Sequence, residues 1–221
     1  MKIQEKNLKY FSSILEFREF LVEAYKFVRQ QFLLHDNKES HSLEHTIRVT
    51  NSCINLANKL DGAIDVVVIA ALFHDVGRPL EDISGKCHAE TSAEIASSYL
   101  IKNSRSDMVE EIEEIILSHR YSKKLEPITK EGKILKDADA LDALGAIGLY
   151  RTISYSVEKR YGLDKALEHF EEKLFKLSSL MRFDLTREIA EAETEILREF
   201  VRQAEKNIIN SDFERVLDSF S

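Results

Sequence analysis

Apolar residues recur at steps of three and four along most of the chain, which is the spacing of one face of an α-helix. The first such stripe consists of Ile14, Phe17, Leu21, Ala24 and Val28. Two adjacent stripes over residues 43–60 predict a second amphipathic helix, and Ser42 before them is a residue type that favours the N-cap. The pattern therefore predicts a chain built from helices that pack on their apolar faces.

The segment from Val66 to Phe73 differs from the others because it is apolar on every face. A helix of that kind normally lies at the buried centre of a bundle. Gly77 and Pro79 follow soon after it and predict that the chain breaks there into a short polar loop. We therefore expect residues 66–73 to form the core helix, with the residues directly after it near the centre of the protein.

Further helical stripes follow in the second half of the chain. We predict helices starting near His88 and near Met108, and then over residues 134–159, 165–180 and 185–207. One face of the last helix holds Leu185, Ile189, Ala192, Ile196 and Phe200. No stretch resembles a linker, so we expect a single all-α domain over residues 1–221, with a core at about 10–180 and a long C-terminal helix at 184–208.

The composition supports this fold class and narrows the function. The chain has 221 residues, of which 43% are hydrophobic, and it contains only 7 Gly and 2 Pro. β-Sandwiches and doubly wound sheets need more turn residues, so an all-helical chain is favoured. The formal net charge of −8 argues against a long duplex nucleic acid as the main partner, since that task needs a concentrated basic face.

Two cysteines, Cys53 and Cys87, are too few for a disulfide framework and form no Cys-x-x-Cys pair. Residues 1–9 lack the apolar region of a signal peptide. The longest apolar run, Val66 to Phe73, is far shorter than the roughly 20 residues that span a bilayer. We therefore expect reduced cysteines, a cytoplasmic protein and no membrane partner.

Polar residues at positions where the pattern predicts burial are the candidates for chemistry. His74 and Asp75 follow directly on the all-apolar segment. His45 and His119 fall on the apolar stripes of their helices, and Asp139 lies among small and apolar residues. Each buried carboxylate needs a cation or hydrogen-bond donors, because burying it alone costs many kcal/mol.

Four of these residues, His45, His74, Asp75 and Asp139, come from three predicted helices that can converge on one point. Two imidazoles and two carboxylates suit Mn²⁺, Fe²⁺, Zn²⁺, Co²⁺ or Ni²⁺ better than Ca²⁺ or a thiolate-binding ion. The alternative is that the inward-pointing histidines are core residues with satisfied hydrogen bonds. Spacing alone leaves both interpretations open.

Five segments resemble, in order, the motifs of the HD-domain metal-dependent phosphohydrolases. They are His41 to Val49, Ala70 to Gly77, His88 to Ala96, Ile116 to Tyr121 and Glu131 to Gly148. The second segment contains the His-Asp pair that gives the family its name. The match covers most of the chain, and five motifs in order are far more specific than any one. The chain is similar to small single-domain members with nucleotide pyrophosphohydrolase or phosphatase activity.

The resemblance implies an HD-type helical bundle with a metal at its centre. It implies that the ligands of the main ion are His45, His74, Asp75 and Asp139. The expected cofactor is one or two divalent ions, drawn from Mn²⁺, Fe²⁺, Mg²⁺, Co²⁺, Ni²⁺ and Zn²⁺. Similar proteins carry a basic residue directly after the last of these ligands, where this chain has Ala140. This departure leaves the substrate open.

The resemblance also implies catalytic roles for Asp75, His88 and His119. Asp75 is expected to be both a ligand and a candidate proton acceptor. The two histidines match positions that bind a second metal in two-metal members and that face the substrate phosphates in one-metal members. Both roles stay open.

A phosphorylated substrate needs cations in a chain this acidic, and four residues are candidates for binding it. They are Arg78, Lys86, Arg120 and Lys136. Each of them, taken alone, also fits an ordinary surface charge. Arg48 lies three residues after His45 and is expected to pair with Asp137 or Asp142.

We therefore predict a metal-dependent hydrolase that cleaves a phosphoester or phosphoanhydride bond of a small-molecule nucleotide, preferably a (deoxy)nucleoside triphosphate. A metal-bound hydroxide is expected to attack phosphorus in line. The alternatives are a 5′-nucleotidase, a cyclic-nucleotide or alarmone hydrolase, a di-iron oxygenase and a non-catalytic nucleotide-binding helical module. An exposed stripe on the C-terminal helix is a candidate contact for a homodimer.

Overall fold

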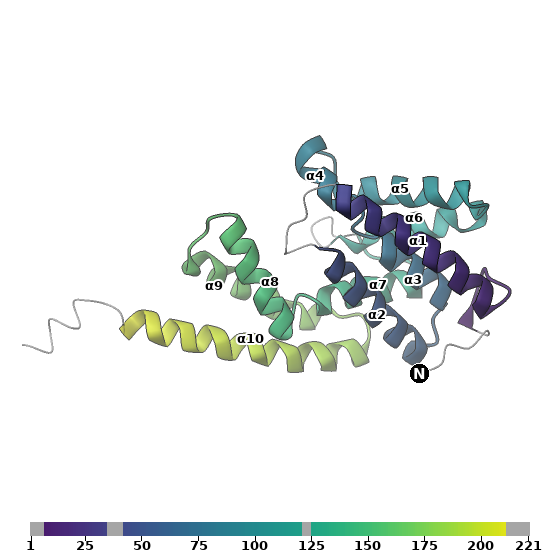
Figure 1. The fold of residues 1–221 in the computed structure, drawn as a ribbon. Coiled ribbons are helices and arrows are strands. Elements are labelled where there is room, and N and C mark those ends of the chain that lie inside the picture. Colours follow the sequence, from purple (N-terminus) through teal and green to yellow (C-terminus); the bar gives the residue numbers. More distant parts are fainter. Residues whose placement is uncertain (1–6, 35–41, 121–124, 211–221) are drawn as a thin grey trace, which may run out of the picture. The chain divides into compact units, whose positions relative to one another are not determined.

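A computed structural model describes residues 7–34, 42–120 and 125–210 (Figure 1). These residues form helices and connecting turns, with no strand among them, which confirms the all-α prediction. The chain divides into two compact units, Met1–Asp142 and Ala143–Ser221. The expectation that residues 1–221 form one domain stays a prediction. Among the described helices, none is long and apolar enough to cross a membrane.

The first unit is built around one buried helix, as the all-apolar segment predicted. Its helices are α1 (Ile14–Leu34), α2 (Leu43–Leu60), α3 (Ile64–Phe73), α4 (Arg78–Ser84), α5 (His88–Lys102), η3 (Ser106–Met108), α6 (Val109–His119) and α7 (Lys130–Leu141). Every residue of α3 is buried, and this helix packs against α1, α2, α5, α6 and α7. The residues that follow α3 are therefore held at the centre of this unit.

The residues after α3 do not form the polar loop that the sequence predicted. They form α4, which begins at Arg78 and places Pro79 in its first turn, where a proline costs no helical hydrogen bond. Arg78 pairs with Glu81 at i,i+3, and Gly85 ends the helix with a left-handed φ of 69°. Ser42 does occupy the N-cap of α2, but its side chain makes no capping hydrogen bond.

The predicted helix over residues 134–159 is two helices. α7 ends at Leu141, and α8 (Gly145–Glu158) begins after a break at the boundary between the two units. The physical reason is Gly145, whose φ of 63° lies in the left-handed region that favours glycine and interrupts a continuous helix. The predicted helix over residues 165–180 is also shorter. α9 (Leu163–Glu172) gives way to the 3₁₀ turns η5 (Leu174–Lys176) and η6 (Ser178–Leu180).

The second unit packs α8, α9, η5 and η6 with the long α10 (Asp184–Asn210). The helix itself was predicted correctly, but its buried face lies one position away from the predicted stripe. The buried positions are Thr186, Ala190, Thr194, Leu197 and Val201. Ile196 of the predicted stripe is 45% exposed. A homodimer contact on this helix stays a prediction.

Candidate metal centre

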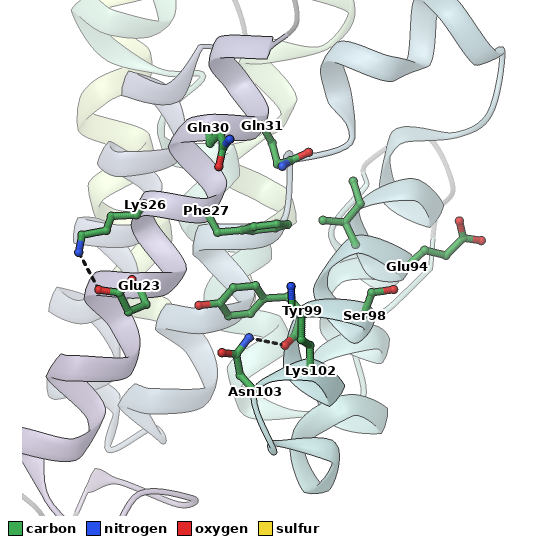
Figure 2. A pocket seen from close by; sticks show the side chains of 11 residues that line it. Glu23, Lys26, Phe27, Gln30, Gln31, Glu94, Ser98, Tyr99, Lys102 and Asn103 are labelled. Atoms are coloured by element: carbon green, nitrogen blue, oxygen red, sulfur yellow. Dashed lines mark hydrogen bonds and ion pairs between the residues drawn. The ribbon is translucent and has the colours of Figure 1, made fainter.

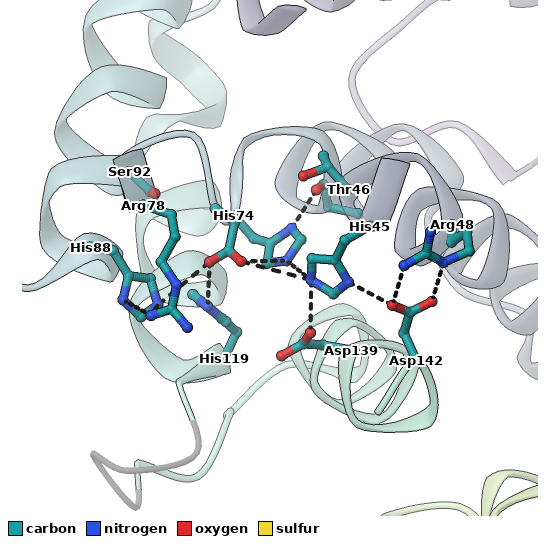
Figure 3. Close-up of polar contacts among 12 residues, drawn as sticks. His45, Thr46, Arg48, His74, Arg78, His88, Ser92, His119, Asp139 and Asp142 are labelled. Atoms are coloured by element: carbon teal, nitrogen blue, oxygen red, sulfur yellow. Dashed lines mark hydrogen bonds and ion pairs between the residues drawn. The ribbon is translucent and has the colours of Figure 1, made fainter. Parts of the chain in front are cut away.

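Six ionisable side chains converge at the centre of the first unit (Figure 3). They are His45 on α2, His74 and Asp75 at the end of α3, His88 at the start of α5, His119 at the end of α6 and Asp139 on α7. The four imidazoles are buried. Their positions follow from the helices that carry them, because the wholly apolar α3 runs into the core and delivers the His-Asp pair there.

The six side chains form two groups, each with ligand atoms that lie within 4.8 Å of one another. The first group is His45, His74 and Asp139, and the second group is Asp75, His88 and His119. In the first group, Nε2 of His45 is 3.3 Å from Oδ1 of Asp139 and 3.4 Å from Nε2 of His74. One ion with bonds of about 2 Å can span such spacings.

Asp75 belongs to the second group by distance but also faces the first. Its Oδ2 atom lies 3.7 Å from Nε2 of His45 and 3.8 Å from Nε2 of His74. Its Oδ1 atom lies 3.5 Å from Nε2 of His88 and 3.7 Å from Nε2 of His119. The carboxylate therefore presents one oxygen to each pair of imidazoles.

The outer nitrogen of each first-group histidine faces an acceptor. Nδ1 of His45 is 2.7 Å from Oδ2 of Asp142, and Nδ1 of His74 is 2.6 Å from the carbonyl oxygen of Ala71. Arg48 donates from Nε and Nη2 to the same Asp142, which confirms one of its two predicted partners (Figure 3). These acceptors hold a proton on Nδ1 of each ring, which leaves Nε2 as the nitrogen that can bind a cation.

The Nε2 atoms of the two first-group rings therefore face each other across 3.4 Å. When both rings are neutral with the proton on Nδ1, neither Nε2 carries a proton, and both offer a lone pair to the space between them. Two converging lone pairs beside two carboxylates are a donor set that a divalent cation satisfies. The residues present therefore fit a metal ion.

The second group has similar outer contacts. Nδ1 of His119 faces the carbonyl oxygen of Ile116, while Nδ1 of His88 is 3.0 Å from Oε2 of Glu81. Arg78 also reaches the His88 ring, with Nη1 2.7 Å from Nδ1. Histidines that bind metals usually have an outer partner of this kind, because it sets the ring orientation.

Burial sets the charge states of the group members. Desolvation lowers the pKa of His74 and that of His88 to about 4, so both rings are neutral near pH 7. Burial by itself would raise the pKa of Asp139, but the adjacent His45 ring and the other imidazoles hold that pKa below its usual range. Neutral imidazole and ionised carboxylate are the forms that bind a metal.

The structure brings together two of the four predicted substrate-binding cations. Arg78 and Arg120 both pair with Glu81, at 3.0 and 3.1 Å, next to His88. The other two predicted cations have different partners: Lys86 pairs with Glu94 on α5, and Lys136 donates to the carbonyl of Leu125.

Sequence reasoning missed Glu81, because its segment was assigned to a loop. The available signal was the Arg78–Glu81 spacing of i,i+3, which supports a helix that begins near Pro79. His41, which begins the first motif, lies outside the described residues.

A separate groove lies between α1 and α5 (Figure 2). In it Lys26 pairs with Glu23, and the side-chain amide of Asn103 donates to the carbonyl of Tyr99. The residues that line it include none of the six candidate ligands. The converging histidines and aspartates are therefore the better candidate for chemistry.

Comparisons with known proteins agree with this geometry. The sequence model of the HD domain family matches residues 42–144 of this chain. The chain is 31% identical over 189 residues to the uncharacterized protein YpgQ of Bacillus subtilis, covering 83% of this chain and 92% of that one. The crystal structure of YpgQ in complex with ADP matches with a TM-score of 0.68 and 27% identity, over 86% of this chain and 96% of that one.

Two further crystal structures point the same way. A predicted HD superfamily hydrolase from an uncultured Thermotogales bacterium has a TM-score of 0.65 and 29% identity, over 88% of this chain and 98% of its own. An HD-superfamily hydrolase from Bacillus thuringiensis has a TM-score of 0.69 and 28% identity, over 89% of this chain and 100% of its own. The chain belongs to the HD-domain superfamily of metal-dependent phosphohydrolases.

Proposed function

We propose that this hydrolase cleaves a phosphoester or phosphoanhydride bond of a nucleotide, with a (deoxy)nucleoside triphosphate as the preferred substrate. The observation that carries the proposal is the convergence of four imidazoles and two carboxylates into two groups, in each of which the ligand atoms lie within 4.8 Å of one another. The complex of the relative YpgQ with ADP supports a nucleotide as the ligand.

His45, His74 and Asp139 would hold the main ion, and Asp75 would face it with Oδ2. His88 and His119 would complete a second site together with the other oxygen of Asp75. When bound, a divalent ion polarises phosphoryl oxygens and acidifies water, which are the two contributions that phosphate hydrolysis needs. Asp75 would also serve as a proton acceptor.

Arg78 and Arg120 would bind the phosphates of the substrate. Both reach the second group through Glu81, and each side chain is partly exposed. The planar guanidinium group suits phosphate oxygens because it donates two parallel hydrogen bonds. Lys86 and Lys136 remain candidates for a more distant part of the substrate, although their described contacts are with Glu94 and Leu125.

The test is release of phosphate and of pyrophosphate from a panel of nucleoside and deoxynucleoside tri- and monophosphates. The assay is run with Mn²⁺, with a chelator, and with Asp75→Ala beside the wild type. We expect turnover that needs metal and that the variant loses, with the product identifying the bond that is cut. No release from any nucleotide would overturn the nucleotide assignment, and oxygen uptake by an iron-loaded protein would favour the oxygenase alternative.

A further inference from the structure

His88 differs from the other three histidines in the contacts of its outer nitrogen. In those three, Nδ1 faces a carboxylate or a backbone carbonyl. Nδ1 of His88 faces Oε2 of Glu81 at 3.0 Å, while Nη1 of Arg78 lies against the ring, 2.7 Å from Nδ1 and 3.4 Å from Nε2. Figure 3 shows the Arg78 guanidinium against this ring.

Two carboxylates on opposite sides of the ring favour opposite tautomers. The Glu81 carboxylate accepts the Nδ1 proton, which leaves the lone pair of Nε2 facing Oδ1 of Asp75 at 3.5 Å. The Asp75 carboxylate can only accept, so in the metal-free protein it favours a proton on Nε2. In that second tautomer Nε2 has no lone pair for a cation. The tautomer of His88 therefore decides whether the second group can bind an ion.

We propose that Glu81 is a positioning residue that holds the proton of His88 on Nδ1 and so keeps the second group open to a divalent ion. Its carboxylate is well placed to do this. Oε2 of Glu81 contacts the His88 ring and also pairs with Arg78, each at 3.0 Å. Oε1 pairs with Arg120 at 3.1 Å. The two arginines thus hold the Glu81 carboxylate against Nδ1, in opposition to Asp75 at Nε2. The consequence for the ion rests on the proposed function, whereas the tautomer itself does not.

The first test reads the tautomer in the metal-free protein. Two-bond ¹H–¹⁵N spectra distinguish a protonated Nδ1 from a protonated Nε2, and His88→Gln identifies the signals of this ring. We expect protonated Nδ1 in the wild type and protonated Nε2 in Glu81→Ala. Glu81→Gln retains a carbonyl oxygen that accepts from Nδ1, so it should keep the wild-type signal. The same tautomer in wild type and Glu81→Ala would overturn the proposal.

The second test titrates Mn²⁺ into the metal-free proteins by calorimetry. Outer partners of ligating histidines typically change metal affinity by 10–100-fold, so we expect Glu81→Ala to weaken the second binding step by about that factor. The first step should stay unchanged. Arg78→Ala leaves the Glu81 acceptor facing Nδ1, so it should weaken the second step less than Glu81→Ala does.

Controls separate this inference from a general loss of charge or of folding. Glu23→Ala removes an exposed carboxylate that pairs with Lys26 on α1, and it should change neither the spectrum nor the titration. Equal weakening in Glu81→Gln and Glu81→Ala would overturn the proposed role. Absence of any Mn²⁺ binding by the wild type would instead overturn the proposed function, while the metal-free spectra would still test the tautomer.

Discussion

The first and second groups are built alike but are held differently. Each has one histidine whose Nδ1 faces a helix carbonyl and one whose Nδ1 faces a carboxylate. In the first group that carboxylate belongs to Asp142, whose side chain is 8% exposed and accepts two hydrogen bonds from Arg48. In the second group it is Glu81, 26% exposed, which is shared among His88, Arg78 and Arg120.

This difference indicates which half of the centre is preorganised and which half can be changed by its surroundings. The Asp142 side chain is largely buried, and its two described partners are compatible with each other. Arg48 orients the carboxylate, and the carboxylate in turn orients the His45 ring. Glu81 is partly exposed, and the two arginines that pair with it are also candidates for binding substrate phosphate. We therefore expect the first ion to bind tightly whether or not substrate is present, and the second to depend on the state of Glu81.

The largest expected effect comes from the residue that both groups share. Asp75→Asn removes the negative charge that lies between the four imidazoles. We expect the reacting phosphate to lose several kcal/mol of stabilisation as a result, which corresponds to at least about a 1000-fold fall in kcat. Steady-state rates with Mn²⁺ measure it. Asp184→Ala, at an exposed carboxylate on α10, is the control. A fall of less than about tenfold would mean that Asp75 does not link the two groups in catalysis.

The next effect is on stability against pH in the metal-free protein. Burial lowers the pKa of His74 in the first group and of His88 in the second to about 4, from 6.5 in the unfolded chain. Below pH 6.5 the unfolded state therefore binds more protons, and stability falls with pH until it levels near pH 4. Each ring accounts for about 3 kcal/mol of that loss.

Urea unfolding in the presence of chelator, from pH 7 to pH 4, measures this loss. His74→Gln and His88→Gln should each flatten the dependence. If only His74→Gln does so, the two groups differ in burial more than the structure indicates.

Much of the candidate centre could be predicted from the sequence, because burial and helical period together specify where a side chain points. His45 and His119 were assigned to the interior by the stripes they continue, and the His-Asp pair by the apolar helix before it. The structure places all four in one centre. Local patterns suffice where a ligand lies in a regular helix or directly after its end.

The parts that the sequence did not predict depend on a single backbone position or on partners from different helices. Nothing in the apolar pattern marks Gly145, yet its left-handed φ of 63° ends the continuity between α7 and α8. The choice of Asp142 over Asp137 for Arg48, and the contact of Glu81 with His88, depend on how the helices pack. A helical period specifies a face but not the partner across from it.

Removing Asp142 should produce a smaller effect than the loss of Asp75, confined to the first group. Asp142→Ala leaves Nδ1 of His45 and the Arg48 guanidinium without this acceptor. Because Arg48 is 35% exposed, we expect roughly 1–3 kcal/mol of lost stability, less than for a fully buried pair. We also expect the first Mn²⁺ to bind about 10–100-fold more weakly. Denaturant unfolding and calorimetry measure the two effects, and Arg48→Lys, which keeps the charge, should lose less of each.

The smallest effect tests the second group without touching any ligand. A Cβ at Gly77 would lie 2.7 Å from the backbone nitrogen of Ser92 and 2.8 Å from the carbonyl oxygen of His88, so Gly77→Ala must displace the start of α5. Such overpacking costs about 1–3 kcal/mol and moves His88 relative to Asp75. Calorimetry should therefore show weaker binding of the second Mn²⁺ and unchanged binding of the first.

Gly162→Ala is the matched control, because an added Cβ there meets nothing within 4 Å. Its free energy of unfolding should stay within about 0.5 kcal/mol of that of the wild type. Equal weakening of both ions in Gly77→Ala would show that the two groups are one mechanical unit, against the division drawn from Asp142 and Glu81.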